Sequence, residues 1–305
     1  MATTASTKVS HTPGPIIVGA DSSLWRVTAV EDDDDNVVEL ASRWVVVATG
    51  ENAEAKVPEL KGRGGFKGGL VHSSEYRSGK EYEGKKVVVV GCGNSGMELC
   101  LDLVDHGALP SLSVRSGMHI LPRELLGAST FVLAMKLLKL FPVKVVDKIL
   151  LILAWVVIGD TGKYGIKRPK IGPMELKNTT GKSPVLDVGS LSLIKKGKIK
   201  IVPEVESLSN NGAKFVDGRL MEFDSVIFAT GYRSNVPLWL KGCDFFSENG
   251  KPKAPYPDSW KGENGLYCVG FAGRGLLGAS SDAVKVALDV AEKWKSLTFQ
   301  NPSWS

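Results

Sequence analysis

The segment from residue 85 to residue 106 constrains the fold more than any other part of the chain. A buried strand of valines, Val87 to Val90, runs into the pattern GxGxxG, and apolar residues then recur at helical spacing from residue 94 to residue 106. Gly91 permits a tight turn, Gly93 lets the backbone approach a pyrophosphate, and Gly96 lets helix and strand pack closely. Free N–H groups at the helix start favour phosphate. The segment therefore predicts a dinucleotide site; a glycine-rich turn without a ligand is the alternative. The predicted loop comprises Gly91, Cys92, Gly93, Asn94, Ser95 and Gly96.

The next strand indicates which dinucleotide is bound. A site for NAD places an acidic residue about 20 residues after the loop, where it binds the ribose 2′-hydroxyl. Here the expected strand, Ser111 to Arg115, ends in a cation, and no acid lies at its end. A guanidinium holds a 2′-phosphate through paired hydrogen bonds, whereas a carboxylate repels it. Arg115 therefore predicts NADP(H), and a solvated strand end is the alternative.

The rest of the chain alternates expected strands with expected helices, which predicts an α/β protein with mainly parallel sheets. We expect a linker from residue 62 to residue 80, a helical region from 130 to 158 interrupted by Pro142, and a closing helix over 281–297 capped by Ser280 or Ser281. The remaining strands are expected at 14–20, 24–30, 36–48, 199–202, 205–208, 213–216, 226–229 and 266–270.

Composition limits the other function classes. A chain of 305 residues is long enough for two domains of roughly 100–200 residues each. The four cysteines form no CxxC pair, and no Cys/His cluster has metal-ligand spacing, so we expect neither a disulfide framework nor a metal site. The missing CxxC also argues against a pyridine-nucleotide disulfide reductase. No apolar run reaches the roughly 20 residues of a membrane span, and residues 1–12 lack a signal-peptide pattern.

Three further motifs point to a second cofactor. Ala48-Thr49-Gly50 and Ala229-Thr230-Gly231-Tyr232 each follow an expected buried strand. In each, a small residue, a hydroxyl and a glycine let the chain turn close beneath a bound group. Between them lies the pattern Phe66-x-Gly68-x-x-x-His72-x-x-x-Tyr76. Each motif is a weak signal alone, but two similar turns on either side of a dinucleotide loop favour a two-nucleotide enzyme.

Together these motifs resemble those of the flavin-containing monooxygenases. The pattern from Phe66 to Tyr76 is similar to that family's identifying sequence, and residues 228–232 (FATGY) are similar to another of its elements. The similarity is closer still to the plant YUCCA branch and covers roughly residues 40 to 295. It rests on the loop from Gly91 to Gly96, on Val114-Arg115-Ser116 followed by His119-x-Leu121-Pro122-Arg123-Glu124, on Gly159-Asp160 with Lys163-Tyr164-Gly165, and on Gly270-Phe271 with Arg274-Gly275-Leu276-Leu277-Gly278-Ala279.

This resemblance implies a reaction and a fold. NADPH reduces FAD, the reduced flavin takes O2 to form a C4a-(hydro)peroxide, and the YUCCA substrate indole-3-pyruvate is oxidatively decarboxylated to the auxin indole-3-acetate. The implied fold has two Rossmann-like domains, with the NADP domain inserted into a discontinuous FAD domain. FAD contacts are implied at Gly19, Thr49, Gly50, Thr230 and Gly231. No residue is assigned to catalysis, because the cofactors carry the chemistry. His72 either belongs to the identifying element or organises its loop.

The sequence departs from the family near its start. Residues 16–20 are similar to the opening strand and first glycine, Gly19, of the FAD motif, but Asp21-Ser22-Ser23-Leu24 follows in place of the remaining glycines and the helix. We therefore expect a truncated FAD domain that lacks roughly a hundred residues. The predicted organisation is 1–80 as the first FAD part and linker, 81–204 as the NADP domain, 205–297 as the second FAD part, and 298–305 as a tail. The alternative function is a catalytically impaired isoform that binds NADPH or partners only.

Two surface features bear on partners and location. Residues 163–200 hold ten Lys or Arg against Glu175 and Asp187, and residues 145–158 are strongly apolar. The basic stretch either forms a solvated surface or attracts anions, and the apolar segment is a core helix, a pocket-lining helix or a membrane-contacting one. No nucleic-acid motif accompanies them. We expect a cytoplasmic protein without a transmembrane segment, in peripheral contact with the cytosolic face of the endoplasmic reticulum.

Overall fold

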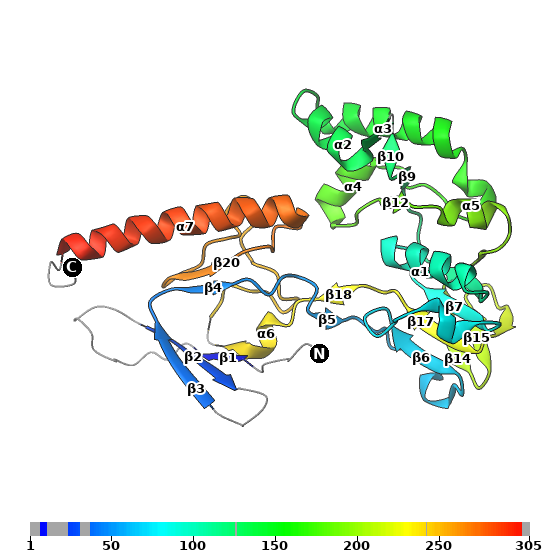
Figure 1. Ribbon diagram of the computed structural model, residues 1–305, viewed down its shortest axis with the longest axis horizontal. Coiled ribbons are helices and arrows are strands. Elements are labelled where there is room, and N and C mark those ends of the chain that lie inside the picture. The colour runs from blue at the N-terminus through cyan, green and yellow to red at the C-terminus, as the bar shows by residue number, and fades with distance from the viewer. Residues whose placement is uncertain (1–6, 11–23, 31–36, 126, 242, 301–305) are drawn as a thin grey trace. The chain divides into compact units, whose positions relative to one another are not determined.

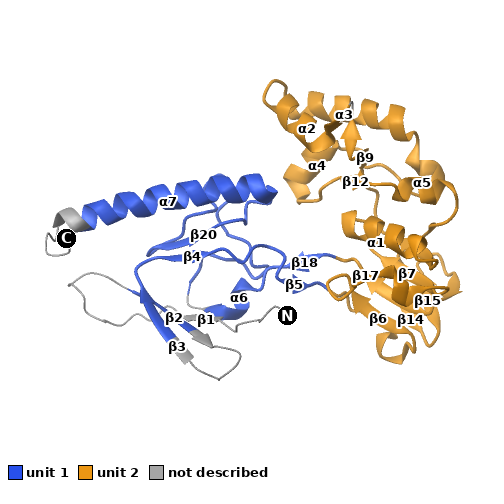
Figure 2. Ribbon diagram, viewed as in Figure 1, with its two compact units in different colours: residues 1–56, 231–305 blue, residues 57–230 orange. Residues whose placement is uncertain are grey.

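The computed structural model describes residues 7–10, 24–30, 37–125, 127–241 and 243–300. Two compact units make up the chain (Figure 2): unit 1 comprises residues 1–56 and 231–305, and unit 2 comprises residues 57–230. Both units mix helices with strands, which confirms the predicted α/β class. Because these units are defined by backbone contacts and not by cofactors, the assignment of 81–204 to an NADP domain and of 1–80 and 205–297 to an FAD domain stays a prediction.

A five-stranded parallel sheet forms the centre of unit 2 (Figure 1). Its strand order is β13, β8, β7, β17, β6, with parallel pairing throughout. The strands are β6 (Gly69–His72), β7 (Lys86–Val90), β8 (Leu109–Ser113), β13 (Lys200–Val202) and β17 (Ser225–Phe228). Helix α1 (Asn94–Asp105) connects β7 to its neighbour β8. This is the strand–helix–strand crossover of a nucleotide-binding fold, with β7 carrying the glycine loop at its carboxyl end.

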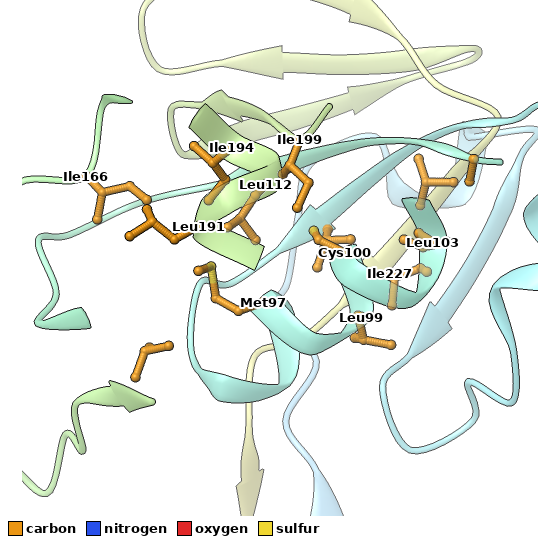
Figure 3. Packing of buried hydrophobic residues seen from close by; sticks show 14 of the residues in the cluster. Met97, Leu99, Cys100, Leu103, Leu112, Ile166, Leu191, Ile194, Ile199 and Ile227 are labelled. Carbon is orange, nitrogen blue, oxygen red and sulfur yellow. The ribbon is translucent and has the colours of Figure 1, made fainter. Parts of the chain in front are cut away.

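Alternating valines of β7 explain why this strand lies in the centre of the sheet. Val87 and Val89 pack into a core with α1 and α5 (Ser190–Lys195), whereas Val88 packs on the opposite face with Phe215 and Phe228. All three valines are fully buried, as successive residues of a strand point to opposite faces. Figure 3 shows the first of these cores, in which Met97, Cys100 and Leu103 of α1 lie near Leu112 and Ile227 of the sheet.

Smaller elements complete unit 2. An antiparallel meander of three strands joins β13 to β17, and a mostly helical segment lies between β8 and β13. The meander consists of β14 (Val205–Ser209), β15 (Gly212–Phe215) and β16 (Leu220–Glu222). The helical segment contains β9 (Ile120–Pro122), β10 (Glu124–Leu125), β11 (Ala128–Ser129), α2 (Thr130–Leu138), α3 (Val143–Ile158), α4 (Pro173–Thr180) and β12 (Val185–Asp187). Short 3-10 helices cover Arg63–Gly65, Gly79–Tyr82 and Thr161–Tyr164.

Unit 1 contains one antiparallel ribbon and two short strand pairs. The ribbon β1–β2–β3 is extended by β19, while β4 pairs in parallel with β20 and β5 pairs with β18. The elements are β1 (Thr7–Ser10), β2 (Trp25–Val30), β3 (Val37–Ser42), β4 (Val45–Val47), β5 (Glu54–Ala55), β18 (Tyr232–Arg233), α6 (Val236–Trp239), β19 (Leu240–Lys241), β20 (Leu266–Cys268) and α7 (Gly275–Gln300).

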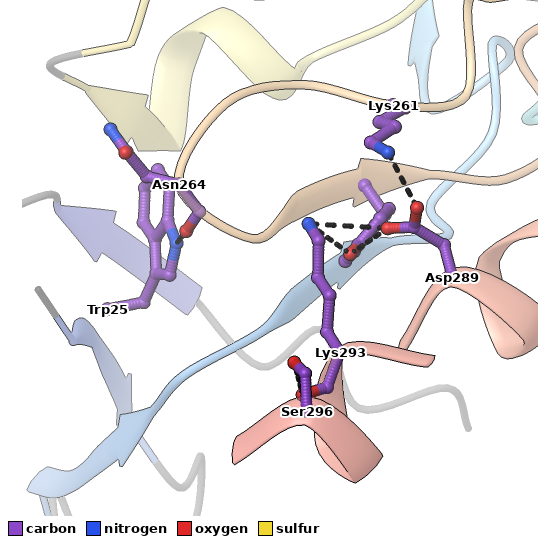
Figure 4. Close-up of polar contacts among 7 residues, drawn as sticks. Trp25, Lys261, Asn264, Asp289, Lys293 and Ser296 are labelled. Atoms are coloured by element: carbon purple, nitrogen blue, oxygen red, sulfur yellow. Dashed lines mark hydrogen bonds and ion pairs between the residues drawn. The ribbon is translucent and has the colours of Figure 1, made fainter. Parts of the chain in front are cut away.

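Polar contacts hold the long helix α7 to β20. Asp289 of α7 accepts hydrogen bonds from Lys261 at 2.6 Å and from the Tyr267 hydroxyl at 2.6 Å, and Lys293 lies 3.3 Å from the same carboxylate (Figure 4).

Trp25 of β2 is buried and donates its indole N–H to the Asn264 carbonyl at 2.7 Å. Among the described helices, none is both long and apolar enough to cross a bilayer.

Three local expectations need comment. The expected linker over 62–80 is wrong in part, because it contains β6, an edge strand of the five-stranded sheet. The closing helix begins at Gly275, so Ser280 and Ser281 lie inside it and do not cap it. The strand expected over 14–20, with Gly19, falls outside the described residues.

Candidate functional site

The glycine loop between β7 and α1 has three glycines with three different roles. Gly91 has φ +110°, a conformation that side chains rarely adopt, and an added Cβ there would collide with the Ala229 carbonyl. A Cβ on Gly96 would collide with the Gly91 carbonyl, so Gly96 lets α1 pack against the end of β7. A Cβ on Gly93 would meet no atom within 4 Å. Gly91 and Gly96 are therefore required by the fold, whereas Gly93 faces open space.

The start of α1 presents its backbone N–H groups without a side-chain cap. Gly93 is the N-cap residue, and none of the described side chains makes a capping hydrogen bond there. The side chain of Asn94 turns away, because its Oδ1 accepts the Leu186 N–H of β12 at 2.9 Å. An uncapped helix start beside an open glycine is a geometry that accommodates a phosphate. Loop and helix thus fit the pyrophosphate of a dinucleotide.

Two cations, Arg115 and Lys182, lie near this loop. The thiol of Cys92 has its pKa raised to about 11, chiefly by burial, while Arg115 and Lys182 act in the opposite direction. Arg115 lies two residues beyond the end of β8, with its side chain largely exposed. Its guanidinium lies 3.9 Å from the carboxylate of Glu204, so an acid does approach this position, but from beyond β13. An exposed pair of this length contributes little, about 0–1 kcal/mol, and leaves Arg115 able to bind a phosphate.

A cavity of about 210 Å³ opens next to the loop. It is mostly apolar, with one cation, Lys177, whose ammonium lies 5.7 Å from the centre of the Phe131 ring. Asn94 contributes to its wall and thereby connects it to the start of α1. The other lining residues are Leu121, Thr130, Ala134, Met174, Ser183, Pro184 and Leu186. The arrangement suits a flat apolar group that carries an anion.

The residues of the pattern from Phe66 to Tyr76 have structural positions. Phe66 is buried in the core around Phe215, and a Cβ on Gly68 would collide with the Phe66 ring and the Asp224 carbonyl. His72 is buried at the end of β6, where its Nδ1 lies 3.0 Å from the Ser74 hydroxyl. Tyr76 donates its hydroxyl to Asp102 of α1 at 2.6 Å. The pattern therefore fixes the edge strand of the sheet to α1.

The turns predicted to contact FAD lie at the ends of β4 and β17. Gly50 (φ +75°) and Gly231 (φ +83°) both adopt conformations that favour glycine, and a Cβ on either would meet no atom within 4 Å. Thr49 is exposed next to Gly50. Thr230 ends unit 2 and Gly231 begins the second part of unit 1, where its carbonyl accepts the Lys56 N–H at 3.0 Å.

Comparison with known proteins decides the family. The family model described as "Flavin-binding monooxygenase-like" matches residues 7–244. The chain belongs to this family. It is 62% identical over 281 residues to the indole-3-pyruvate monooxygenase YUCCA8 of Oryza sativa subsp. indica, which covers 90% of this chain and 67% of the relative. It is 55% identical to the probable indole-3-pyruvate monooxygenase YUCCA1 of Arabidopsis thaliana, over 90% of this chain and 66% of that protein. The predicted resemblance is confirmed.

Solved structures confirm the fold of this flavin monooxygenase. A flavin-containing monooxygenase from Stenotrophomonas maltophilia superposes with a TM-score of 0.59 at 19% identity, covering 90% of this chain and 68% of that one. OTEMO, in a complex with FAD and NADP, superposes with a TM-score of 0.60 at 17% identity, covering 90% and 64%. The chain thus spans about two thirds of the length of the relatives it matches.

One buried carboxylate of unit 1 has an unpartnered oxygen among the described residues and was not singled out from the sequence. Asp282 of α7 is buried, and its Oδ2 accepts the Gly270 N–H at 3.4 Å, while its Oδ1 has no hydrogen-bond partner among the described residues. A ligand hydroxyl, such as those on the ribityl chain of FAD, would satisfy this oxygen. Asp282 lies in unit 1, as do Thr49, Gly50 and Gly231, whose contact with FAD stays a prediction.

Other residues near the site were also missed. Lys177 lines the cavity and Lys182 acts on Cys92 of the loop, both from more than 80 residues further along the chain. Glu204 approaches Arg115 from about 90 residues further along. The excess of cations over residues 163–200 was the only sequence signal for the two lysines. No signal for Glu204 was present, because strand pairing alone brings β13 next to β8.

Proposed function

We propose that this chain is an NADPH- and FAD-dependent monooxygenase of the YUCCA type, which converts indole-3-pyruvate into indole-3-acetate by oxidative decarboxylation and so serves auxin biosynthesis. The observation that carries the proposal is the uncapped start of α1 beside the open Gly93, in a chain that is 62% identical over 281 residues to a rice indole-3-pyruvate monooxygenase.

The residues of the loop would bind NADPH. The N–H groups at the start of α1 would hold the pyrophosphate, and Arg115 would hold the 2′-phosphate, with Lys182 adding positive charge. Cys92, Asn94 and Ser95 complete the loop, and the Asn94 side chain fixes it to β12. Thr49, Gly50, Gly231 and Asp282, all in unit 1, would hold the part of FAD that the described residues reach. Thr230, which ends unit 2, stays a predicted FAD contact. When bound, FAD accepts the hydride of NADPH and activates O2.

The cavity beside Asn94 would take the acidic substrate. Its apolar wall, which includes Phe131 and Met174, suits an indole ring, and Lys177 offers the charge that a 2-oxo acid carboxylate requires. Burial of the ring in such a wall also excludes water, and a reactive oxygen species needs that protection. The relatives are indole-3-pyruvate monooxygenases by name, and we propose the same substrate for this chain.

A second candidate is a catalytically impaired form that binds NADPH or partners only. The observation that favours it is the sheet of unit 1: among the described residues, β4 pairs with β20 alone. Gly19, the predicted first glycine of the FAD motif, lies outside the described residues. The cytoplasmic location and the position at the cytosolic face of the endoplasmic reticulum stay predictions.

Measurements on purified protein distinguish the active enzyme from the impaired form. The enzyme should carry flavin at near-unit stoichiometry, oxidise NADPH in the presence of indole-3-pyruvate, and release indole-3-acetate, which mass spectrometry detects. Protein that binds NADPH in a titration, yet holds no flavin after reconstitution with excess FAD and forms no product, would establish the impaired form. Failure to bind NADPH as well would refute both candidates.

A further inference from the structure

We propose that the outward side of α3 docks on the surface of an anionic membrane. We call this surface the α3 outer face and define it by Lys144, Val145, Lys148, Ile152, Trp155 and Val156. The proposal does not rest on the enzymatic function, because it uses no residue of the dinucleotide loop, the cavity or the FAD turns.

The inner side of α3 is already satisfied by packing. Val146, Leu150, Ala154 and Ile158 recur every four residues and are buried. Val146 and Leu150 pack in one cluster with Ala134 of α2 and Met174 of α4. This buried stripe is the one apolar side that a surface helix normally packs against the protein core.

The opposite side is apolar as well, and it is exposed. Ile152 is 63%, Trp155 62% and Val156 69% exposed, with Val145 also exposed at the other end of the helix. Residues 145, 152 and 156 follow each other at intervals of seven and four, so they form a second stripe on one side of the helix. A helix that is apolar on both sides is typical of burial in a larger body or in a lipid interface.

Charge on this part of unit 2 favours an anionic lipid over other apolar partners. Residues 130–170 contain eight Lys or Arg and only two acids, Asp147 and Asp160. Asp147 is buried on the inner side of α3, where it accepts the N–H groups of Met174 and Glu175 at 2.7 and 3.1 Å, so its carboxylate is not part of the outer face. Lys144 and Lys148 are exposed, and Lys148 lies one turn before Ile152.

The length and composition of α3 determine how it would lie. Its 16 residues are too few to cross a bilayer, for which about 20 are needed, but they suffice to lie in the plane of the interface. Tryptophan is favoured at that depth, and lysine stems reach from it to the headgroups. The expected state is therefore a helix lying on the membrane with Trp155, Ile152 and Val156 inserted between headgroups.

Vesicle sedimentation with the full chain tests the proposal. We expect binding to vesicles of phosphatidylcholine with 30% phosphatidylserine, about tenfold weaker binding to pure phosphatidylcholine, and loss of binding as salt is raised. The double variants Trp155→Ser/Val156→Ser and Lys144→Glu/Lys148→Glu should each bind about tenfold more weakly. The matched controls are Leu220→Ser, an equally exposed residue on β16, and Lys198→Glu/Lys200→Glu, which makes the same charge change; both should bind like the parent chain.

Two results would overturn the proposal. One is vesicle binding that the outer-face variants leave unchanged while their circular dichroism shows that they are folded. The other is a concentration-dependent dimer of the parent chain, measured by light scattering, that Trp155→Ser/Val156→Ser abolishes while vesicle binding is absent; the face would then belong to a second copy. Lipid insertion itself is measured by tryptophan fluorescence. Brominated lipids should quench the fluorescence of the parent chain more strongly than that of a Trp155→Phe variant.

Discussion

Replacing Gly93 by alanine tests whether the loop after β7 binds a nucleotide. Gly93 has φ −74°, which alanine adopts readily, and the added methyl group would meet no atom of the protein within 4 Å. The methyl group would instead occupy the space beside the uncapped start of α1. Gly93→Ala should therefore leave the fold intact and block the approach of a pyrophosphate.

The position of Gly93 determines the expected changes in the free energy of unfolding and in the dissociation constant for NADPH. Alanine at an N-cap costs about 0.5–1 kcal/mol relative to glycine, while the smaller entropy of the unfolded chain returns about 0.4–1 kcal/mol. The free energy of unfolding should thus change by less than about 1 kcal/mol. Loss of one hydrogen bond to a charged phosphate costs about 1.5–3 kcal/mol, which corresponds to a dissociation constant for NADPH about ten to a hundred times higher.

Calorimetric titration with NADPH and thermal unfolding without ligand measure the two quantities. Gly64→Ala is the matched control, because its Cβ also meets nothing within 4 Å and it lies outside the loop. Gly96→Ala provides the opposite pattern: its Cβ collides with the Gly91 carbonyl, so it should destabilise the fold by about 1–3 kcal/mol. Unchanged NADPH affinity in folded Gly93→Ala would refute the assignment of the loop to the pyrophosphate.

Three further predictions concern charged groups. Arg115→Gln should weaken NADPH binding about tenfold and leave NADH binding unchanged, since only NADPH carries a 2′-phosphate; paired titrations measure this. Lys177→Met should weaken the binding of indole-3-pyruvate about tenfold but not that of uncharged indole, as measured by ligand-observed NMR. Burial alone raises the pKa of Asp289, but its three hydrogen-bond donors outweigh burial and set this pKa at about 2. The stabilisation by Asp289 is therefore complete above about pH 4 and is lost as the pH falls through about 2. In Asp289→Asn, the free energy of unfolding measured by urea titration should fall less steeply than in the parent chain as the pH drops below about 4.

Local patterns made the dinucleotide loop predictable from the sequence. One continuous segment contains all of the signals: four valines, three glycines at fixed spacing and an apolar period typical of a helix. The structure has β7 and α1 at the expected places. The environment of Arg115 was not predictable in the same way. Glu204 reaches it because β13 pairs with β8, a contact between residues about 90 positions apart that no local period encodes.

The errors have equally specific causes. Residues 62–80 were expected as a linker because they are rich in glycine and charge, yet β6 forms there because β17 offers it a paired edge and His72 and Tyr76 fix its end. Sequence also placed the start of the last helix too late. Gly275 and Gly278 are weak helix formers, but the buried Asp282 and its contact with the Gly270 N–H hold the first turns of α7 in place.

Among the described residues, the sheet that carries the predicted NADPH loop is more completely paired than the strands that carry the predicted FAD turns. In unit 2, β7 has a paired strand on each side and a hydrophobic core on each face, so we expect the predicted NADPH loop to form without a ligand. In unit 1, β4 pairs with β20 alone among the described residues, and two strands by themselves are marginally stable. The core around Trp25, Val47 and Phe271 packs in the same unit as the turns predicted to contact FAD. We therefore expect the binding energy of FAD to contribute to the stability of this region, and the affinity for FAD, more than that for NADPH, to limit turnover.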